Sequence, residues 1–138
     1  MGKIKYDLDV IRYINIFERI TNIPVKDAIN NENKILFVVP TGMAGLAIGK
    51  NGVNVKKIEA MINKRVEVVE YVDNPVNFIS KFLSPIRIRN IYLAEKSDGS
   101  KVMHIHASRE AIPRIKARIK NIKNLLSRYF GIKEIEFH

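Results

Sequence analysis

Residues 46–58 read LAIGKNGVNVKKI, and this stretch decides how the rest of the chain is interpreted. Gly49 and Gly52 enclose Lys50 and Asn51, and the apolar residues that follow have the spacing of a helix. Glycine reaches backbone conformations closed to other residues and has no side chain to keep a ligand from the main chain. The helix after the turn directs its first N–H groups and its positive dipole end toward it. The pattern predicts a tight turn suited to an anion such as phosphate, with Lys50 adding a charge.

The residues beside this turn favour a nucleic-acid ligand. Lys56 and Lys57 follow on the next helix, while Ile48 and Val53 place apolar surface next to the turn. Phosphates would lie along the turn and bases would rest on the apolar side chains, which requires unpaired bases and so favours single strands. The alternative is a turn between two helices that binds nothing, and we interpret the similarly spaced glycines of residues 42–45 in that way because the residues between them are uncharged.

The composition describes a basic chain without cysteine. Its 138 residues are 46% hydrophobic, and 24 Lys and Arg against 14 Asp and Glu give a net charge of +10, with a pI near 9.9. Such a charge concentrates polyanions, of which nucleic acid is the commonest in a cell, although solubility alone is the alternative. Without cysteine, disulfides and thiolate metal sites are excluded. No apolar run approaches the roughly 20 residues of a membrane helix, so we expect a cytoplasmic protein without a membrane partner.

Apolar periodicity predicts the same order of elements in both halves of the chain. In the first half we expect a helix over 7–21, strands over 25–29 and 34–39, a helical turn over 43–48, a helical stripe over 55–62 and a strand over 65–72. In the second half we expect a helix over 76–83, strands over 86–93 and 102–106 around a hairpin turn at 97–100, a helical stripe over 112–126 and a strand over 132–137. Apolar residues recur at an offset of 64 positions, which indicates an internal repeat rather than a chance likeness of two α+β units.

With these elements in place, the segment AIGKNGVNVKKIE resembles the KH domain with its G-x-x-G loop, in the type II arrangement. Two such units in tandem, preceded by a helix containing FERITN, closely resemble the archaeal NusA-like transcription factors. The resemblance implies an α+β fold of two KH domains, over 1–73 and 74–138, each a three-stranded sheet with helices on one face. It also implies binding of single-stranded RNA in transcription elongation, pausing or termination, with RNA polymerase as a second partner. We expect a monomer without a cofactor or catalytic activity.

The resemblance assigns roles to individual residues of the first unit. A KH loop grips the sugar-phosphate backbone of about four nucleotides. Here the loop would be formed by Gly49, Lys50, Asn51 and Gly52. The groove beside it would be flanked by Ile48, Val53, Asn54, Lys56 and Lys57.

The second unit departs from this pattern. At the 64-residue offset Gly49 and Gly52 correspond to Pro113 and Lys116, which predicts a loop at 113–116 without the glycine grip. Either Pro113 starts a helix, or one helical stripe runs through and erases the turn. Residues 85–138 carry a net charge of +7, against +3 for residues 1–84. The candidates for secondary RNA contacts are Arg114, Lys116, Arg118, Lys120 and Lys123, unless they form only a solvated helix face.

Other functional classes fit the sequence less well. AGLAIGK is similar to a phosphate-binding Walker A loop, but Ala44 and Asn51 replace the required glycine and Ser or Thr. His104 and His106 share one strand face without a third metal ligand at a suitable spacing, so we interpret them as polar surface and expect no metal site. Glu67 and Glu70 mark the solvated side of a strand rather than an acid–base pair. Two alternatives stay open: a KH protein of the ribosome or of RNA processing, and a module that docks on RNA polymerase with only non-specific RNA affinity.

Overall fold

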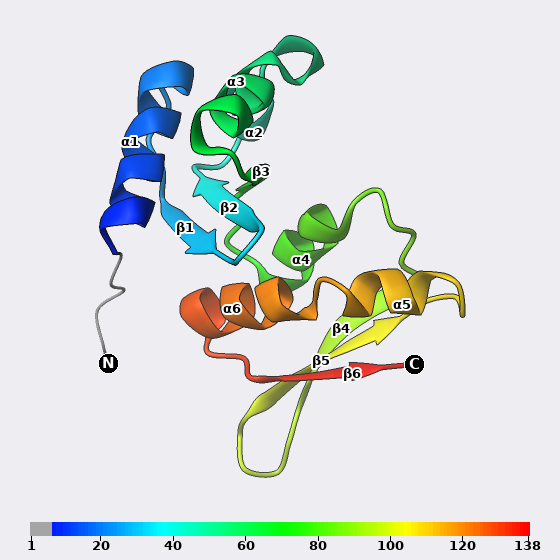
Figure 1. Ribbon diagram of the computed structural model, residues 1–138. Coiled ribbons are helices and arrows are strands. Elements are labelled where there is room, and N and C mark those ends of the chain that lie inside the picture. The colour runs from blue at the N-terminus through cyan, green and yellow to red at the C-terminus, as the bar shows by residue number, and fades with distance from the viewer. Residues whose placement is uncertain (1–6) are drawn as a thin grey trace. The chain divides into compact units, whose positions relative to one another are not determined.

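The computed structural model describes residues 7–138, which divide into two compact units. One unit ends at Tyr71, and the other comprises Val72–His138. Each contains one three-stranded sheet with its own helices (Figure 1). Among the described residues, none of the helices combines the length and the apolar character needed to cross a bilayer.

The first unit consists of α1 (Leu8–Thr21), β1 (Asp27–Asn30), β2 (Lys34–Val39), α2 (Ala44–Ile48), the single turn η1 (Lys50–Gly52), α3 (Val53–Ile62) and β3 (Arg65–Glu70). Its sheet has the order β1-β2-β3, with β1 antiparallel and β3 parallel to the central β2. A parallel pair needs a long crossover, and α2, η1 and α3 provide it. The turn of residues 49–52 therefore lies in the middle of this crossover.

The core of the first unit forms where the helices meet the sheet. Asp7 caps α1 by accepting a hydrogen bond from the Val10 N–H at 2.9 Å. Phe17 of α1 is fully buried, and its ring centroid lies 4.4 Å from that of Phe37 on β2. Ile58 of α3 is also fully buried in this cluster. This packing fixes α3, and with it the direction of the turn that precedes it.

The second unit consists of α4 (Pro75–Leu83), β4 (Asn90–Glu95), β5 (Lys101–His106), α5 (Ala111–Lys116), α6 (Ile119–Phe130) and β6 (Glu134–Phe137). Its sheet repeats the first, with order β4-β5-β6, β4 antiparallel to β5 and β6 parallel to β5. Met103 and Ile105 of β5 are fully buried, as are Ile122 and Leu125 of α6. The predicted α+β fold, with the order helix–strand–strand–helix–helix–strand in each half, is confirmed.

Two strand boundaries in the second unit were predicted wrongly. The strand expected over 86–93 begins only at Asn90, because the Ile86 N–H donates to the Leu83 carbonyl at 2.8 Å and folds the chain into a turn after α4. The strand expected over 132–137 begins at Glu134, because the Ile132 N–H donates to the Leu126 carbonyl at 3.2 Å and closes the end of α6. In both cases the apolar alternation begins before the extended backbone does.

Candidate nucleic-acid interface

The turn of residues 49–52 has a backbone that few residues other than glycine adopt. Gly49 has φ 81° and ψ 166°, Asn51 has φ 56° and ψ 26°, and Gly52 has φ 73° and ψ 21°. Asparagine is one of the few residues with a side chain that enters the left-handed region routinely. The Gly52 N–H donates to the Gly49 carbonyl at 3.0 Å, which closes the turn. The sequence Gly-Lys-Asn-Gly therefore fits this conformation at each position that has a positive φ.

Gly49 is also required by the neighbouring side chains. A Cβ atom at this position would lie 3.0 Å from Asn54 Cγ and 3.0 Å from Val53 Cγ1. Asn54 Nδ2 in turn donates to the Leu46 carbonyl at 3.3 Å, which links the first turn of α3 to the end of α2. The same Cβ at Gly52 would meet nothing within 4 Å. Gly49 thus packs the turn against α3, whereas Gly52 leaves open space in front of the backbone.

The structure brings the predicted residues of the first unit together around this turn. Lys50, Asn51, Lys56 and Lys57 are exposed, and Ile48, Gly49, Gly52 and Asn54 are half-buried. Val53 is 44% exposed although it is apolar. Positive charge and accessible apolar surface therefore occur on the same short segment. Asn54 carries a structural hydrogen bond in addition to the role that the resemblance gives it.

Two exposed apolar residues shortly before the turn in the chain were missed in the sequence. Leu46 is 69% exposed, and Met43, which precedes the helix, is 36% exposed. Ala47 is the buried residue of α2, and Ala44 and Ile48 are half-buried, so Leu46 is the side chain of this short helix that remains exposed. The exposure of these side chains depends on how α2 packs, and the sequence does not reveal it.

The second unit has no counterpart of this turn at the predicted place. Residues 113–116 lie inside α5, so the prediction of a loop there is wrong. Pro113 is tolerated because it is the third residue of the helix, where the N–H that proline lacks would have no partner within the helix. The helix begins instead where the Ala111 N–H donates to Ser108 Oγ at 3.1 Å. Ala117 and Arg118, both with negative φ, form the break between α5 and α6, so the stripe is not one continuous helix either.

The basic residues of this second helix pair differ in what they contact. Arg114, Lys116 and Lys120 are exposed, and Lys116 Nζ lies 5.5 Å from the centroid of the Phe137 ring. Arg118 is half-buried. Its Nη1 donates to the Phe82 carbonyl at 2.9 Å, and its guanidinium lies 4.1 Å from the centroid of the Phe82 ring. Arg118 therefore helps to hold α4 against the start of α6, a role that its charge alone did not indicate.

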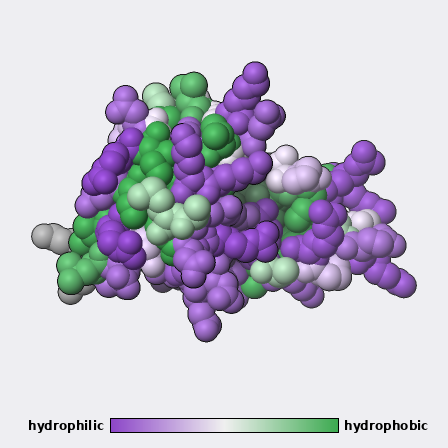
Figure 2. Space-filling model, turned by 45° about the horizontal axis from the view of Figure 1, so that its top comes forward, coloured by the Kyte–Doolittle hydropathy of each residue, from purple (hydrophilic) through white to green (hydrophobic). Residues whose placement is uncertain are grey.

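Hydrophilic residues dominate the face drawn in Figure 2, and hydrophobic ones form smaller groups between them. Glu67, which was considered for acid–base work, forms an ion pair with Lys34 at 3.5 Å across β2 and β3. That contact agrees with a role on the strand surface.

Comparisons with known proteins give a consistent family. A family model described as "KH domain" matches residues 11–96. Three archaeal relatives are each described as "Probable transcription termination protein NusA". The Methanocaldococcus jannaschii protein is 36% identical over 67% of this chain, but the chain spans only 51% of that relative. The Methanococcus vannielii protein is 30% identical over 97% of this chain and 79% of its own length. The Halococcus morrhuae protein is 31% identical over 91% of this chain and 92% of its own length.

A solved structure extends the likeness to three dimensions. The structure entitled "Crystal structure of APE1850" superimposes with a TM-score of 0.79 at 29% sequence identity, over 96% of this chain and 100% of the other. The likeness thus includes both sheets and is not confined to the segment that the KH model matches. On the matched KH model and these relatives, the chain belongs to the archaeal NusA-like family of KH-domain proteins.

Proposed function

We propose that this protein binds single-stranded RNA through the turn of residues 49–52 and acts in transcription elongation, pausing or termination. The observation that carries the proposal is a turn with positive φ at Gly49, Asn51 and Gly52, which presents open backbone beside Lys50 at the start of α3. The names of the archaeal relatives support the transcriptional part of the proposal. RNA polymerase is then the second partner, and the protein acts by binding, without a chemical step.

The phosphates are the part of RNA that suits the backbone of the turn. The space in front of Gly52 admits a phosphodiester close to the main chain. α3 directs its positive dipole end to the same place, and its N-cap Gly52 supplies no side chain to occupy the helix terminus. Positive charges that are exposed to solvent are added by Lys50 in the turn and by Lys56 and Lys57 on α3. Three phosphate contacts of this kind on a single strand would give a slope of about −2 in log affinity against log salt.

The bases would rest on the apolar side chains beside the turn. Leu46, Val53 and Met43 remain exposed on the segment that contains the turn, at a cost in hydration that contact with a base would relieve. A paired base is stacked inside its duplex and offers no such face, so this surface favours unpaired RNA. The combination predicts stronger binding to a single strand than to a duplex of the same sequence.

The second unit would add charge without a grip. Residues 113–116 are helical and provide no exposed glycine backbone. The second unit still has exposed basic side chains at Arg114, Lys116 and Lys120. These side chains can neutralise phosphates with little base discrimination. We place Arg118 apart from these three because its guanidinium already contacts Phe82. In this proposal residues 1–73 and 74–138 are two KH domains, of which the first binds RNA specifically.

Gly52→Asp tests the grip most sharply, and Gly131→Asp is its matched control. Gly131 ends α6 with φ 67° and ψ 19°, almost the conformation of Gly52, and an added Cβ meets nothing within 4 Å at either position. Both variants therefore add the same charge at similar backbone strain. A carboxylate about 4 Å from a phosphate in water costs about 1 kcal/mol or more, so Gly52→Asp should weaken binding at least about fivefold. Fluorescence anisotropy with a labelled RNA oligonucleotide would measure it.

Equal losses from the two glycine variants would overturn the proposal for the turn. The charges of the second unit are tested by Arg114→Ala/Lys116→Ala across a salt series, which should reduce the salt slope by about 1.4. An affinity of the unchanged protein that does not vary with salt would contradict electrostatic binding altogether. A protein that binds RNA polymerase in a pull-down but shows no preference for single-stranded RNA would support the docking module instead.

A further inference from the structure

One face of the second sheet carries a group of imidazole rings. In the register of β4 and β5, Tyr92 lies opposite His104, and Asn90 lies opposite His106. In the register of β5 and β6, His104 lies opposite Glu136. His138 follows the end of β6, where its N–H donates to the Ile105 carbonyl at 2.9 Å. Met103 and Ile105, which alternate with the histidines, are buried beneath the helices, so the histidines face away from α5 and α6.

The rings on this face are held by one another. Tyr92 stacks on His104 with centroids 5.0 Å apart and planes 12° apart. His106 stacks on His138 with centroids 4.5 Å apart and planes 19° apart. The imidazoles of His104 and His138 thus each have an aromatic ring stacked against them, which restricts their rotation. This arrangement preorganises His104 and His138 relative to each other.

Three potential ligand atoms meet at one point of the face. His104 Nδ1 lies 2.9 Å from His138 Nε2 and 3.9 Å from Glu136 Oε1. One ligand atom from each of His104, Glu136 and His138 lies within 4.8 Å of the others. The prediction of no metal site assumed that His104 and His106 lacked a third ligand. The partners of His104 lie on β6 and directly after it, more than thirty positions along the chain.

We propose that His104, Glu136 and His138 form a binding site for a divalent transition-metal ion, with Zn²⁺ as the best fit. Two imidazole nitrogens and one carboxylate oxygen are a common set of three protein ligands for zinc, with a fourth position left for water. Nitrogens that share one zinc ion at about 2.0–2.1 Å lie about 3.4 Å apart in a tetrahedral site. His104 Nδ1 and His138 Nε2 lie 2.9 Å apart, so they would have to move apart by only about 0.5 Å to share a zinc ion. The Glu136 side chain is 54% exposed and can rotate to complete the set of ligands.

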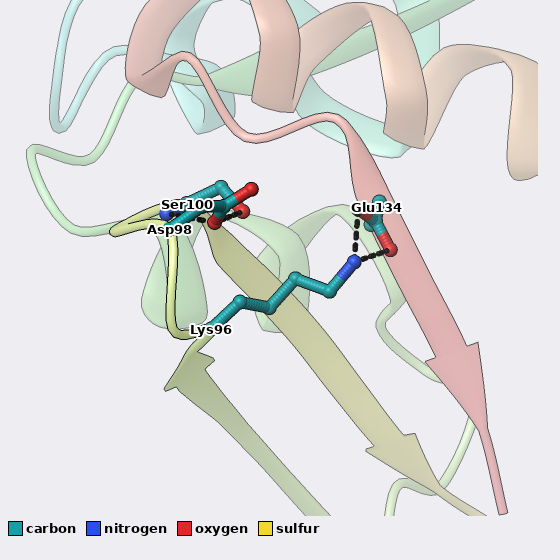
Figure 3. Close-up of polar contacts among 4 residues, drawn as sticks. All are labelled: Lys96, Asp98, Ser100 and Glu134. Carbon is teal, nitrogen blue, oxygen red and sulfur yellow. Dashed lines mark hydrogen bonds and ion pairs between the residues drawn. The ribbon is translucent and has the colours of Figure 1, made fainter.

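The surrounding charges leave Glu136 available for this role. Glu134, two residues earlier on β6, accepts two hydrogen bonds from Lys96 Nζ at 2.8 and 3.0 Å (Figure 3). Lys96 is thus hydrogen-bonded to the other carboxylate of the strand, and it acts on Glu136 only through its charge. Bound zinc would link His104 of β5 to Glu136 of β6 and to His138 after it, and so would add to the backbone pairing and side-chain contacts that already join these segments.

Calorimetric titration of the full chain with ZnCl₂ tests the site directly. We expect one ion per chain. His104→Ala and His138→Ala should each weaken binding about 100-fold or more, and Glu136→Gln about tenfold or more, since even supporting residues of metal sites contribute 10- to 100-fold. The matched control is Lys96→Met/Glu134→Gln, which removes a carboxylate from the same strand together with its partner, and should change the affinity less than about threefold.

Each variant should keep its fold, because these side chains lie on the face of the sheet that is turned away from the helices. Circular dichroism would check this. Zinc should also raise the melting temperature of the unchanged protein but not that of His138→Ala, because an ion that binds only the folded state stabilises it. Failure to observe saturable binding would overturn the proposal. So would binding that survives loss of His104 and His138 unchanged. Neither outcome bears on RNA binding by residues 49–52.

Discussion

Gly49 should be the least replaceable residue of the turn at residues 49–52. Its φ of 81° and ψ of 166° fall in a region that is essentially reserved for glycine, where another residue costs about 1–3 kcal/mol. An added methyl group would also lie 3.0 Å from side-chain atoms of Asn54 and Val53, which must move aside at a cost of about 1 kcal/mol. Gly49→Ala is therefore expected to lower the unfolding free energy of the first unit by about 3 kcal/mol.

Two other glycines make this prediction quantitative. Gly52 and Gly131 both adopt the left-handed helical conformation, and a Cβ at either would meet nothing within 4 Å. Alanine in this conformation costs about 1 kcal/mol. Gly52→Ala should therefore destabilise the first unit, and Gly131→Ala the second, by only about 1 kcal/mol each. The difference between Gly49 and Gly52 isolates the effect of packing and of the glycine-only backbone.

Native-state hydrogen exchange can measure each unit separately. The slowest-exchanging amides report unfolding of the unit that contains them. Those of β2, whose residues from Ile35 to Val39 are fully buried, should report on the first unit, and those of β5 on the second. If Gly49→Ala destabilised β2 no more than Gly52→Ala does, the reasoning from its backbone and its contacts with Asn54 would be refuted.

Three further predictions concern the rest of the fold. Asp7→Ala removes the cap of α1 and should cost about 1 kcal/mol in urea unfolding, whereas an unchanged midpoint would contradict the capping role. Arg118→Met should destabilise the second unit by about 2 kcal/mol through loss of its contacts with Phe82, while exposed Arg114→Met should cost less than about 0.5 kcal/mol; equal costs would contradict the contrast. Hydrogen bonds from Ser100 lower the pKa of Asp98 from its ordinary 3.8, and the hydrogen bond and charge of Glu134 raise the pKa of Lys96 above 10.5. The folding stability that Asp98 contributes is present above pH 3.8 and is lost as the pH falls below that value. The folding stability that Lys96 contributes is present below pH 10.5 and is lost as the pH rises beyond that value. Asp98→Asn and Lys96→Met should thus shift the urea midpoint by an amount that stays constant from about pH 5 to about pH 9, and a shift that varied within this range would contradict the assignment.

Elements with strong local signals could be predicted from the sequence. The strand β2 matches its predicted bounds because a continuous apolar run is enclosed by the turn residues at 30–33 and by Pro40. The helix predicted over 76–83 lies within α4, which begins one residue earlier because Asn74 Oδ1 caps it by accepting the Asn77 N–H at 3.0 Å. The Gly-Lys-Asn-Gly turn was recognisable because few other residues fit its backbone. In each case the residues that specify the structure are neighbours in the chain.

Features set by tertiary packing could not be predicted in this way. Alignment at a 64-residue offset placed a loop at 113–116, but side-chain spacing does not reveal that α5 continues through Pro113. The structural role of Arg118 depends on Phe82, 36 positions earlier. The meeting of His104 with Glu136 and His138 depends on the register of β5 and β6, which periodicity alone leaves open. These are the places where distant segments decide the outcome.

The most direct measurement of RNA binding is an amide correlation spectrum recorded during titration with a short single-stranded RNA. We expect the largest shifts at the amides of residues 48–57, with Gly49 and Gly52 among them, and smaller shifts on α5 and α6 that disappear as salt is raised. Amides of residues 49–52 that stay unmoved at saturating RNA, or shifts confined to residues 101–138, would contradict the assignment of the turn as the RNA-binding site.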